Sequence, residues 1–211
     1  MVRRVLQLVV LAAGISGVFS SALAGDAEAG KSLYPVCTAC HGPAGLGNQA
    51  MNAPKIAGQE AWYIVKQMQL FQNGARGTAP GDMHGMQMAM MSKGPQLAGE
   101  EALHNLAAYI GTFPDADVPT TVTGDVAAGK TLYTVCAACH GPAGEGVEAM
   151  AGPKLVGQSD WYLVNQLNKF KQGQRGYHDM DHGGRQMRPM VSTLVDDKAV
   201  NDVVAYINSL Q

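Results

Sequence analysis

All four cysteines of the chain lie in two short units in which a histidine directly follows the second cysteine. The units read Cys37-Thr-Ala-Cys40-His41 and Cys136-Ala-Ala-Cys139-His140. Cysteines separated by two residues fit three kinds of chemistry: a disulfide or redox pair, half of a zinc site, and covalent attachment of a c-type haem. The histidine favours the third, because it can supply an axial ligand to iron beside the point of attachment.

Haem attachment accounts for every fixed residue of the unit. Two intervening residues place both thiols on one turn, where they can add to the two vinyl groups of a porphyrin, and the next residue turns its imidazole towards the iron. A thioredoxin-like dithiol would need a βαβ context, and zinc would need a second pair of ligands in each copy; the sequence shows neither. We therefore predict two covalently bound haem c groups, with His41 and His140 as iron ligands.

The two units belong to an internal repeat with an offset of 99 residues. Aligned without a gap, residues 25–77 and 124–176 are identical at 31 of 53 positions. A period of this length corresponds to a whole domain rather than to a solenoid unit. Residues 114–123 hold two prolines and no helical period, so we predict a linker there, between domains at 25–113 and 124–211.

Residues 1–24 have the pattern of a secretory signal peptide. Arg3 and Arg4 precede an apolar run over residues 5–19, and a small-residue site ends at Ala24. The run is too short for a comfortable membrane span, and its flanks occur in the order that export requires rather than as in a buried core helix. We expect cleavage after Ala24 and a periplasmic mature protein.

The composition argues against a nucleic-acid partner and leaves little aromatic surface for a hydrophobic core. Lys plus Arg number 15 against 17 for Asp plus Glu, a net charge of -2, which argues against a nucleic-acid partner. Hydrophobic residues make up 46% of the chain but aromatic residues only 6%. A domain of roughly ninety residues with so few aromatic rings would be only marginally stable, and a buried macrocycle would supply the missing apolar area.

The periodicity of each copy is helical. Apolar residues recur at spacings of three or four and predict helices at 62–71, 161–170, 103–110 and 200–210. Asp26 and Asp125 are candidate N-caps of short helices that run towards the cysteines, and Gly74 ends the helix at 62–71. Gly- and Pro-rich loops are expected between these helices, and no segment alternates like a strand. The fold class is therefore all-α.

Both copies carry a Gln-Met-x-x-Met unit that can supply the sixth iron ligand. The first methionine lies 12 residues after an arginine in each copy, from Arg76 to Met88 and from Arg175 to Met187. Because this register is kept, we predict Met88 and Met187 as the axial thioethers.

Other assignments of these residues stay open. Met91 and Met190 share the same register and are the rival ligands, followed by Met90, and some of these methionines serve as core filler. The other histidines that could replace methionine are His84, His104, His178 and His182. Five methionines between Met83 and Met91 also fit a copper(I) site, because thioethers suit that soft ion, although the second copy does not repeat the density.

At these residues the sequence resembles class I c-type cytochromes, and the tandem arrangement resembles the dihaem cytochrome c4 family. The resemblance covers essentially the whole chain after residue 24. It implies two tandem class I cytochrome c-like domains, each wrapped around one covalently attached haem. It also implies that the carbonyls of Pro54 and Pro153 hold the proximal imidazoles.

Two further pairs of positions gain an interpretation from the same resemblance. Gly30 with Tyr109, and Gly129 with Tyr206, would mark the crossing of the first and last helix of each domain, where a missing side chain permits close approach. Arg76 and Arg175 would either pair with haem propionates or be solvated loop residues.

The function implied is that of a periplasmic electron carrier rather than an enzyme. Iron would cycle between Fe(II) and Fe(III) by outer-sphere transfer between respiratory redox partners, from a quinol-oxidising complex to a terminal oxidase or reductase. Contact with a membrane would arise only through such a partner complex. Two alternatives stay open: a dihaem peroxidase or reductase, which needs one five-coordinate iron, and a permanently docked subunit of a membrane complex.

Overall fold

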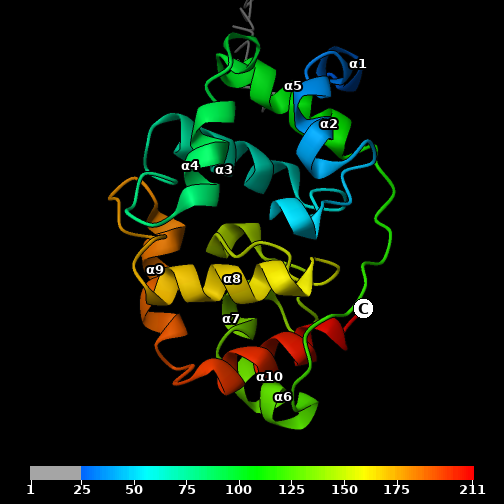
Figure 1. Cartoon of the computed structure of the whole chain (residues 1–211). Helices are drawn as coiled ribbons and strands as arrows, with labels where there is room; N and C mark the ends of the chain where they lie inside the picture. Colours follow the sequence, from blue (N-terminus) through cyan, green and yellow to red (C-terminus); the bar gives the residue numbers. More distant parts are fainter. Residues whose placement is uncertain (1–24) are drawn as a thin grey trace, which may run out of the picture.

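The computed structural model describes residues 25–211, and the predicted signal peptide at 1–24 lies outside the described residues. Helices make up each half of this part of the chain (Figure 1). The first half contains α1 (Ala27–Lys31), α2 (Pro35–His41), α3 (Ala61–Gln72), α4 (Met83–Met91) and α5 (Glu100–Ile110), with 3-10 turns η1 (Gln49–Met51) and η2 (Pro95–Leu97). The second half contains α6 (Val126–Tyr133), α7 (Ala137–His140), α8 (Asp160–Lys171), α9 (His182–Val191) and α10 (Asp197–Asn208), with the 3-10 turn η3 (Glu148–Met150).

The all-α prediction is confirmed for residues 25–211. The β pairing in this range is confined to two isolated bridges, Asn48 with Ala53 and Val147 with Gly152, at equivalent positions of the two copies. No helix in the same range is both long and apolar enough to cross a membrane.

The first and last helices of each domain cross closely at a glycine, as expected. An ideal Cβ on Gly30 of α1 would lie 1.9 Å from the carbonyl oxygen of Asn105 in α5 and 2.9 Å from Cβ of Tyr109. Gly129 of α6 meets Asp202 and Tyr206 of α10 in the same way. Only a residue without a side chain permits backbones to approach this closely.

The short first helices are capped by the predicted aspartates. The side chain of Asp26 accepts hydrogen bonds from two amides in the first turn of α1, and Asp125 does the same for α6. Such caps satisfy donors that a helix start leaves unpaired. The caps also join the first helix to the last, because the amide of Asp26 donates to Asn105 at 2.7 Å and that of Asp125 donates to Asp202 at 2.8 Å.

Helices α4 and α9 were not predicted, because their sequences read as Gly-rich loops. Each begins at an aspartate, Asp82 or Asp181, whose side chain accepts a hydrogen bond from the amide three residues on, at Gly85 or Gly184. A Cβ on either glycine would lie 2.1 Å from that carboxylate. The glycines that weaken helix propensity are therefore required by the cap that starts the helix.

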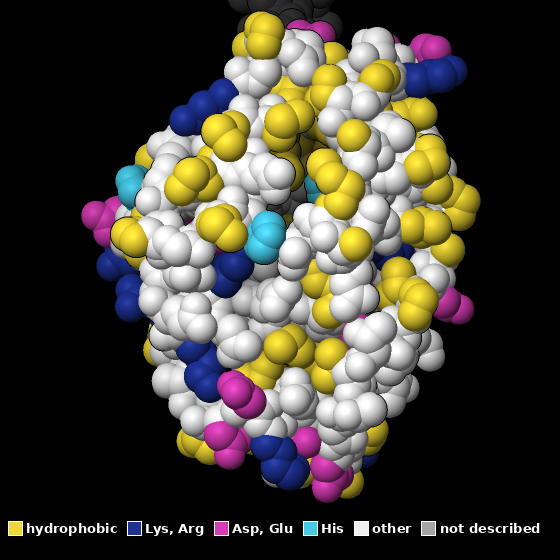
Figure 2. Space-filling view, viewed as in Figure 1, with side chains coloured by type: hydrophobic (Ala, Val, Ile, Leu, Met, Phe, Trp, Pro, Cys, Tyr) yellow, Lys and Arg dark blue, Asp and Glu magenta, His cyan; other side chains and the backbone are white. Residues whose placement is uncertain are grey.

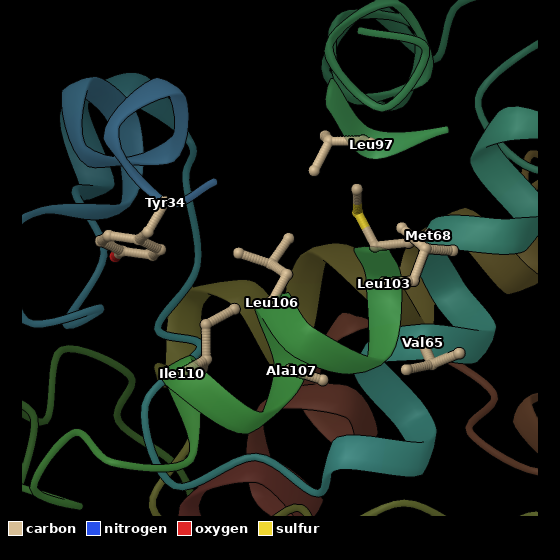
Figure 3. Close-up of a cluster of buried hydrophobic side chains, with 8 residues drawn as sticks. All are labelled: Tyr34, Val65, Met68, Leu97, Leu103, Leu106, Ala107 and Ile110. Atoms are coloured by element: carbon tan, nitrogen blue, oxygen red, sulfur yellow. The ribbon is translucent and has the colours of Figure 1, made fainter. Parts of the chain in front are cut away.

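Each domain has a small apolar core formed mainly by its third and last helices, with a tyrosine, Tyr34 or Tyr133, from the segment before the Cys-x-x-Cys-His unit. In the first domain the core consists of Tyr34, Val65, Met68, Leu97, Leu103, Leu106, Ala107 and Ile110 (Figure 3). Cys37 and Met88 pack against this cluster, and Cys136 packs against its counterpart in the second domain. Three of the residues predicted to hold haem therefore lie directly on the cores.

The segment between α5 and α6 is held against both domains. Asp115 of this segment accepts hydrogen bonds at 2.6 Å from Lys55 of the first domain and Lys154 of the second. Lys55 is almost fully buried and also donates to the carbonyl oxygen of Gly157 at 2.9 Å. Burial opposes ionisation of Asp115, but the two lysines lower the pKa of its carboxyl below the ordinary value.

Replacing Gly30 with alanine should destabilise the protein by about 1–3 kcal/mol or more, because the new methyl group forces α1 and α5 apart. Denaturant unfolding of the haem-loaded protein measures this. Gly111→Ala is the matched control, since Gly111 has a φ of -62° and its nearest neighbour would lie 3.3 Å from the new carbon. Equal unfolding midpoints for the two variants would contradict the close crossing.

Candidate haem-binding sites

One continuous cavity, lined by residues of both domains, contains all the predicted attachment and ligand residues. Its lining includes both cysteines and the histidine of each Cys-x-x-Cys-His unit, together with the predicted methionines Met88 and Met187. The walls are mainly apolar, from α3 and α4 in the first domain and from α8 and α9 in the second. A large planar apolar group is the kind of ligand that such walls favour.

The two histidines are buried and have a fixed orientation. His41 ends α2 and His140 ends α7, with exposed fractions of 7% and 5%. Nδ1 of each ring lies 2.8 Å from a proline carbonyl oxygen, that of Pro54 or Pro153. A carbonyl can only accept, so Nδ1 carries the proton and Nε2 keeps the lone pair that binds a metal. This confirms the expected role of both prolines.

Burial also keeps these imidazoles neutral. Burial lowers the pKa of His41 and His140, and the hydrogen bond to the proline carbonyl only partly offsets this effect. Neutral imidazole is the form that coordinates iron, so the environment prepares both side chains for that role.

The four thiols are unpaired and partly buried. Burial, with a smaller contribution from Cys40, raises the pKa of Cys37 to about 11, and burial likewise raises the pKa of Cys136. A redox-active dithiol needs a lowered pKa, because the thiolate is the reactive form. The electrostatics therefore disfavour the dithiol alternative. Within residues 25–211 no group of three or more His, Cys, Asp or Glu could hold a metal ion, which leaves zinc without a ligand set.

The predicted methionines and their rivals lie at different depths. Met88 of α4 is partly buried and packs against the core, whereas Met91 also lines the cavity but is 48% exposed. In α9 Met187 is partly buried, and Met190 lines the cavity at 45% exposure. The third rival, Met90, is 64% exposed and is not part of the cavity wall.

The histidines that could replace methionine differ in position. His84 of α4 lines the cavity. His104 lies on α5 beside Glu100, at 3.7 Å, and His178 accepts a hydrogen bond from the amide of Met180. His182 is exposed at the first turn of α9. The two His-Gly segments therefore do not provide equivalent ligands in the two domains.

Three buried hydrogen-bond donors in the cavity wall have no protein partner in the part of the chain that the structure describes, and they show whether the cavity suits a haem. Nε1 of Trp62 and Nε of Arg76 and Arg175 are buried, have no hydrogen-bond partner among residues 25–211, and belong to residues of the cavity wall. Unpaired buried donors of this kind are costly and call for an acceptor. Haem propionates are carboxylates and supply such acceptors, so the donor set fits the group.

The two arginines are structural parts of the cavity rather than solvated loop residues. Arg76 and Arg175 are 7% and 4% exposed, and each guanidinium lies over a phenylalanine ring, that of Phe71 or Phe170, at 4.4 and 4.3 Å. Contacts of a cation with a ring face stabilise it most where water is excluded. The alternative of a solvated loop arginine is therefore wrong at both positions.

A network across the domain boundary joins the two arginines. Oε1 of Gln67 accepts from Arg76 at 2.6 Å and from Arg175 at 3.3 Å. Oε1 of Gln166 accepts from Arg76 at 3.1 Å and from Arg175 at 3.0 Å. Each arginine is thus bound by a glutamine of its own domain and by one of the other domain, which fixes the two halves of the cavity relative to each other.

Two tyrosines complete this network. The hydroxyl of Tyr162 accepts from Arg76 at 3.0 Å, and that of Tyr63 accepts from Arg175 at 3.3 Å. Burial opposes ionisation of Tyr162, but the two arginines lower the pKa of its hydroxyl below the ordinary value. These glutamines and tyrosines were not predicted from the sequence, although both residue types recur at the offset of 99.

Comparisons with known proteins agree with this geometry. The family model described as Cytochrome c matches residues 27–114 and again 126–211. Cytochrome c4 of Azotobacter vinelandii is 33% identical over 98% of this chain and 99% of its own length. A protein named thiosulfate dehydrogenase electron acceptor, from Stutzerimonas stutzeri, is 30% identical over 84% of this chain and 86% of its own length.

A solved structure shares the whole architecture. The crystal structure of reduced recombinant cytochrome c4 from Pseudomonas stutzeri superposes with a TM-score of 0.67 at 30% identity. The match covers 89% of this chain and 100% of that chain. The chain therefore belongs to the cytochrome c family, with two tandem domains that bind two covalent haem c groups, and is similar along its length to the cytochromes c4.

Proposed function

We propose that this chain is a periplasmic electron carrier that transfers single electrons between respiratory redox partners. Each haem, when bound, supplies one Fe(II)/Fe(III) couple. The observation that carries the proposal is the repetition of one set of groups in both halves of the cavity: a buried imidazole with a fixed tautomer, two thiols and a methionine at the same register. Two sites with the same groups suit the entry and exit of electrons. A dihaem enzyme would instead need one iron site that differs from the other.

The axial thioethers in this proposal are Met88 and Met187. Both are partly buried on the cavity wall, and Met88 is packed against the core, so their positions are better defined than those of the more exposed Met91 and Met190. An iron with histidine on one side and methionine on the other has no free position for oxygen or peroxide. This arrangement supports a carrier rather than a dihaem peroxidase or reductase.

The proposed partners are redox proteins. Methionine ligation raises the potential relative to bis-histidine ligation, which suits delivery from a quinol-oxidising complex to a terminal oxidase or reductase. The relatives named thiosulfate dehydrogenase electron acceptor favour a second class of donor, an enzyme that oxidises an inorganic sulfur compound. Contact with a membrane would arise through a partner complex.

The domain boundaries in this proposal are those expected from the sequence. Residues 1–24 act as a cleaved signal peptide, and domains at 25–113 and 124–211 flank a linker at 114–123. The contacts of Asp115 with lysines of both domains support a linker that holds the domains together rather than one that lets them move independently.

The haem content tests the proposal directly. Mature protein made in a host with cytochrome maturation should hold two haems per chain that resist acid-acetone extraction, as measured by the pyridine haemochrome spectrum. A Cys136→Ser/Cys139→Ser variant should keep one covalent haem, that of the first domain. Folded but colourless wild-type protein would refute the proposal.

Leucine substitutions distinguish the methionine ligands. Met88→Leu should remove about half of the far-red sulfur-to-iron charge-transfer band of the ferric protein, because one of two sites loses its thioether. Met91→Leu is the matched control and should keep the whole band. The same contrast is expected between Met187→Leu and Met190→Leu. A reversed pattern would assign the rival methionines, and rapid binding of carbon monoxide to one haem of the wild type would favour the enzyme alternative.

The glutamine network should hold the two haem-binding halves together. Gln166→Leu removes the oxygen shared by Arg76 and Arg175, so two buried charged donors lose an acceptor. We expect a loss of about 1–3 kcal/mol or more in the free energy of unfolding. Denaturant unfolding measures it, with the exposed substitution Gln96→Leu as control. If both variants unfold at the wild-type midpoint, the network does not stabilise the interface.

A further inference from the structure

Three methionines of α4 have no role in the haem sites or in the core. Met83, Met86 and Met90 are 71%, 47% and 64% exposed, and none of them lines the cavity. Other residues of α4 make its inward contacts: Gly85 and Ala89 are buried, and Met88 packs against the core. Burial of a methionine side chain is worth about 1.5–3 kcal/mol, so three exposed ones on a single short helix give up that stabilisation.

The three side chains share one face of the helix. Their spacings are three and four residues, which places neighbours about 5–6 Å apart at Cβ on the same side of an α-helix. Met86 lies between the other two, one turn from each. Methionine has an unbranched, flexible side chain, so the sulfur atoms of Met83 and Met90 can swing towards that of Met86. The helix therefore presents a thioether cluster to solvent.

The second domain provides an internal comparison. Met88 and Met91 recur at the offset of 99 as Met187 and Met190, but Met83, Met86 and Met90 are replaced there by His182, Arg185 and Pro189. The two methionines of α4 that line the cavity are thus common to both copies, and the three of α4 that face solvent belong to the first copy alone. Hydrophobic side chains gather over the upper, first domain in Figure 2, whereas charged groups are frequent towards the lower end.

We propose that Met83, Met86 and Met90 form a surface site for copper(I). Thioether sulfur is a soft, uncharged donor that selects Cu(I) over harder divalent ions. Leucine or isoleucine would serve an apolar contact equally well, and only methionine supplies sulfur at all three positions. Because Arg185 would place a positive charge at the central position in α9, the site exists once per chain. Binding of Cu(I) is a coordination step without electron transfer, and it is independent of the proposed electron-carrier function.

Copper(I) competition on the haem-loaded, fully ferrous protein tests the site without oxidation of the metal by ferric haem. Under anaerobic conditions the wild type should take one Cu(I) per chain from a chromogenic Cu(I) chelator. The Met83→Leu/Met86→Leu/Met90→Leu variant should bind Cu(I) at least about 10–100-fold more weakly, the loss typical of disturbing a metal site. Met86→Leu alone should weaken binding more than Met83→Leu or Met90→Leu, because Met86 is the central ligand.

Matched controls make the test specific. The Met51→Leu/Met180→Leu variant removes exposed methionines that lie outside both α4 and the cavity wall, and it should bind Cu(I) as the wild type does. Thioethers do not titrate, so affinity at this site should not fall as the pH drops through about 6.5, the ordinary pKa of histidine. A fall there would assign the ion to a histidine and overturn the proposal, as would a wild type that takes no Cu(I) or a triple leucine variant that binds it equally well. Haem content and the far-red band report separately on the electron-carrier function.

Discussion

The hydrogen bond between each buried imidazole and a proline carbonyl is the constraint on which each domain depends. This bond leaves Nε2 as the ring nitrogen that can bind iron. It can form only because the chain turns back towards the histidine after the Cys-x-x-Cys-His unit. In the first domain the amide of Gly47 donates to the carbonyl of His41, and Asn48 then pairs with Ala53 just before Pro54. Gly47 has a φ of +82°, and a Cβ there would lie 2.6 Å from the amide of Lys55. Glycine is thus required at the turn that brings the proline to the histidine.

The buried arginines make the two sites one structural unit. Neutral glutamine and tyrosine oxygens satisfy the ends of both guanidinium groups, but within residues 25–211 neither group forms an ion pair and the Nε donors have no acceptor. Propionate carboxylates would provide both the charge and the acceptors. Since each glutamine binds both arginines, a shift of one domain would break hydrogen bonds at both sites. Haem binding and domain packing therefore stabilise each other.

Sequence reasoning predicted the parts of the structure that depend on local chemistry or on repetition. The Cys-x-x-Cys-His units and the capping aspartates Asp26 and Asp125 have a short-range signature, whereas the proline partners and the glycine crossings were implied by the resemblance to class I c-type cytochromes. Helices α4 and α9 also begin at a capping aspartate, Asp82 or Asp181, but glycine lowers helix propensity in their first turn, so these segments read as loops. The Gln67 and Gln166 network was missed for another reason: its contacts between the domains join residues 90 or more apart in sequence, and an amide side chain predicts no particular contact.

The two copies share the cysteines and histidines of the Cys-x-x-Cys-His units, the buried arginines and the proposed methionine ligands, but they differ on the outer faces of α4 and α9. Asp82 and Gly85 recur as Asp181 and Gly184, since a change at either position would disturb the cap that starts the helix. A solvent-facing position has few contacts, and substitutions there usually change stability by less than about 0.5 kcal/mol. The outer faces of α4 and α9 were therefore free to become a thioether cluster in one copy and an arginine-bearing surface in the other. The two halves of the cavity therefore share the same candidate ligands but lie behind different outer surfaces.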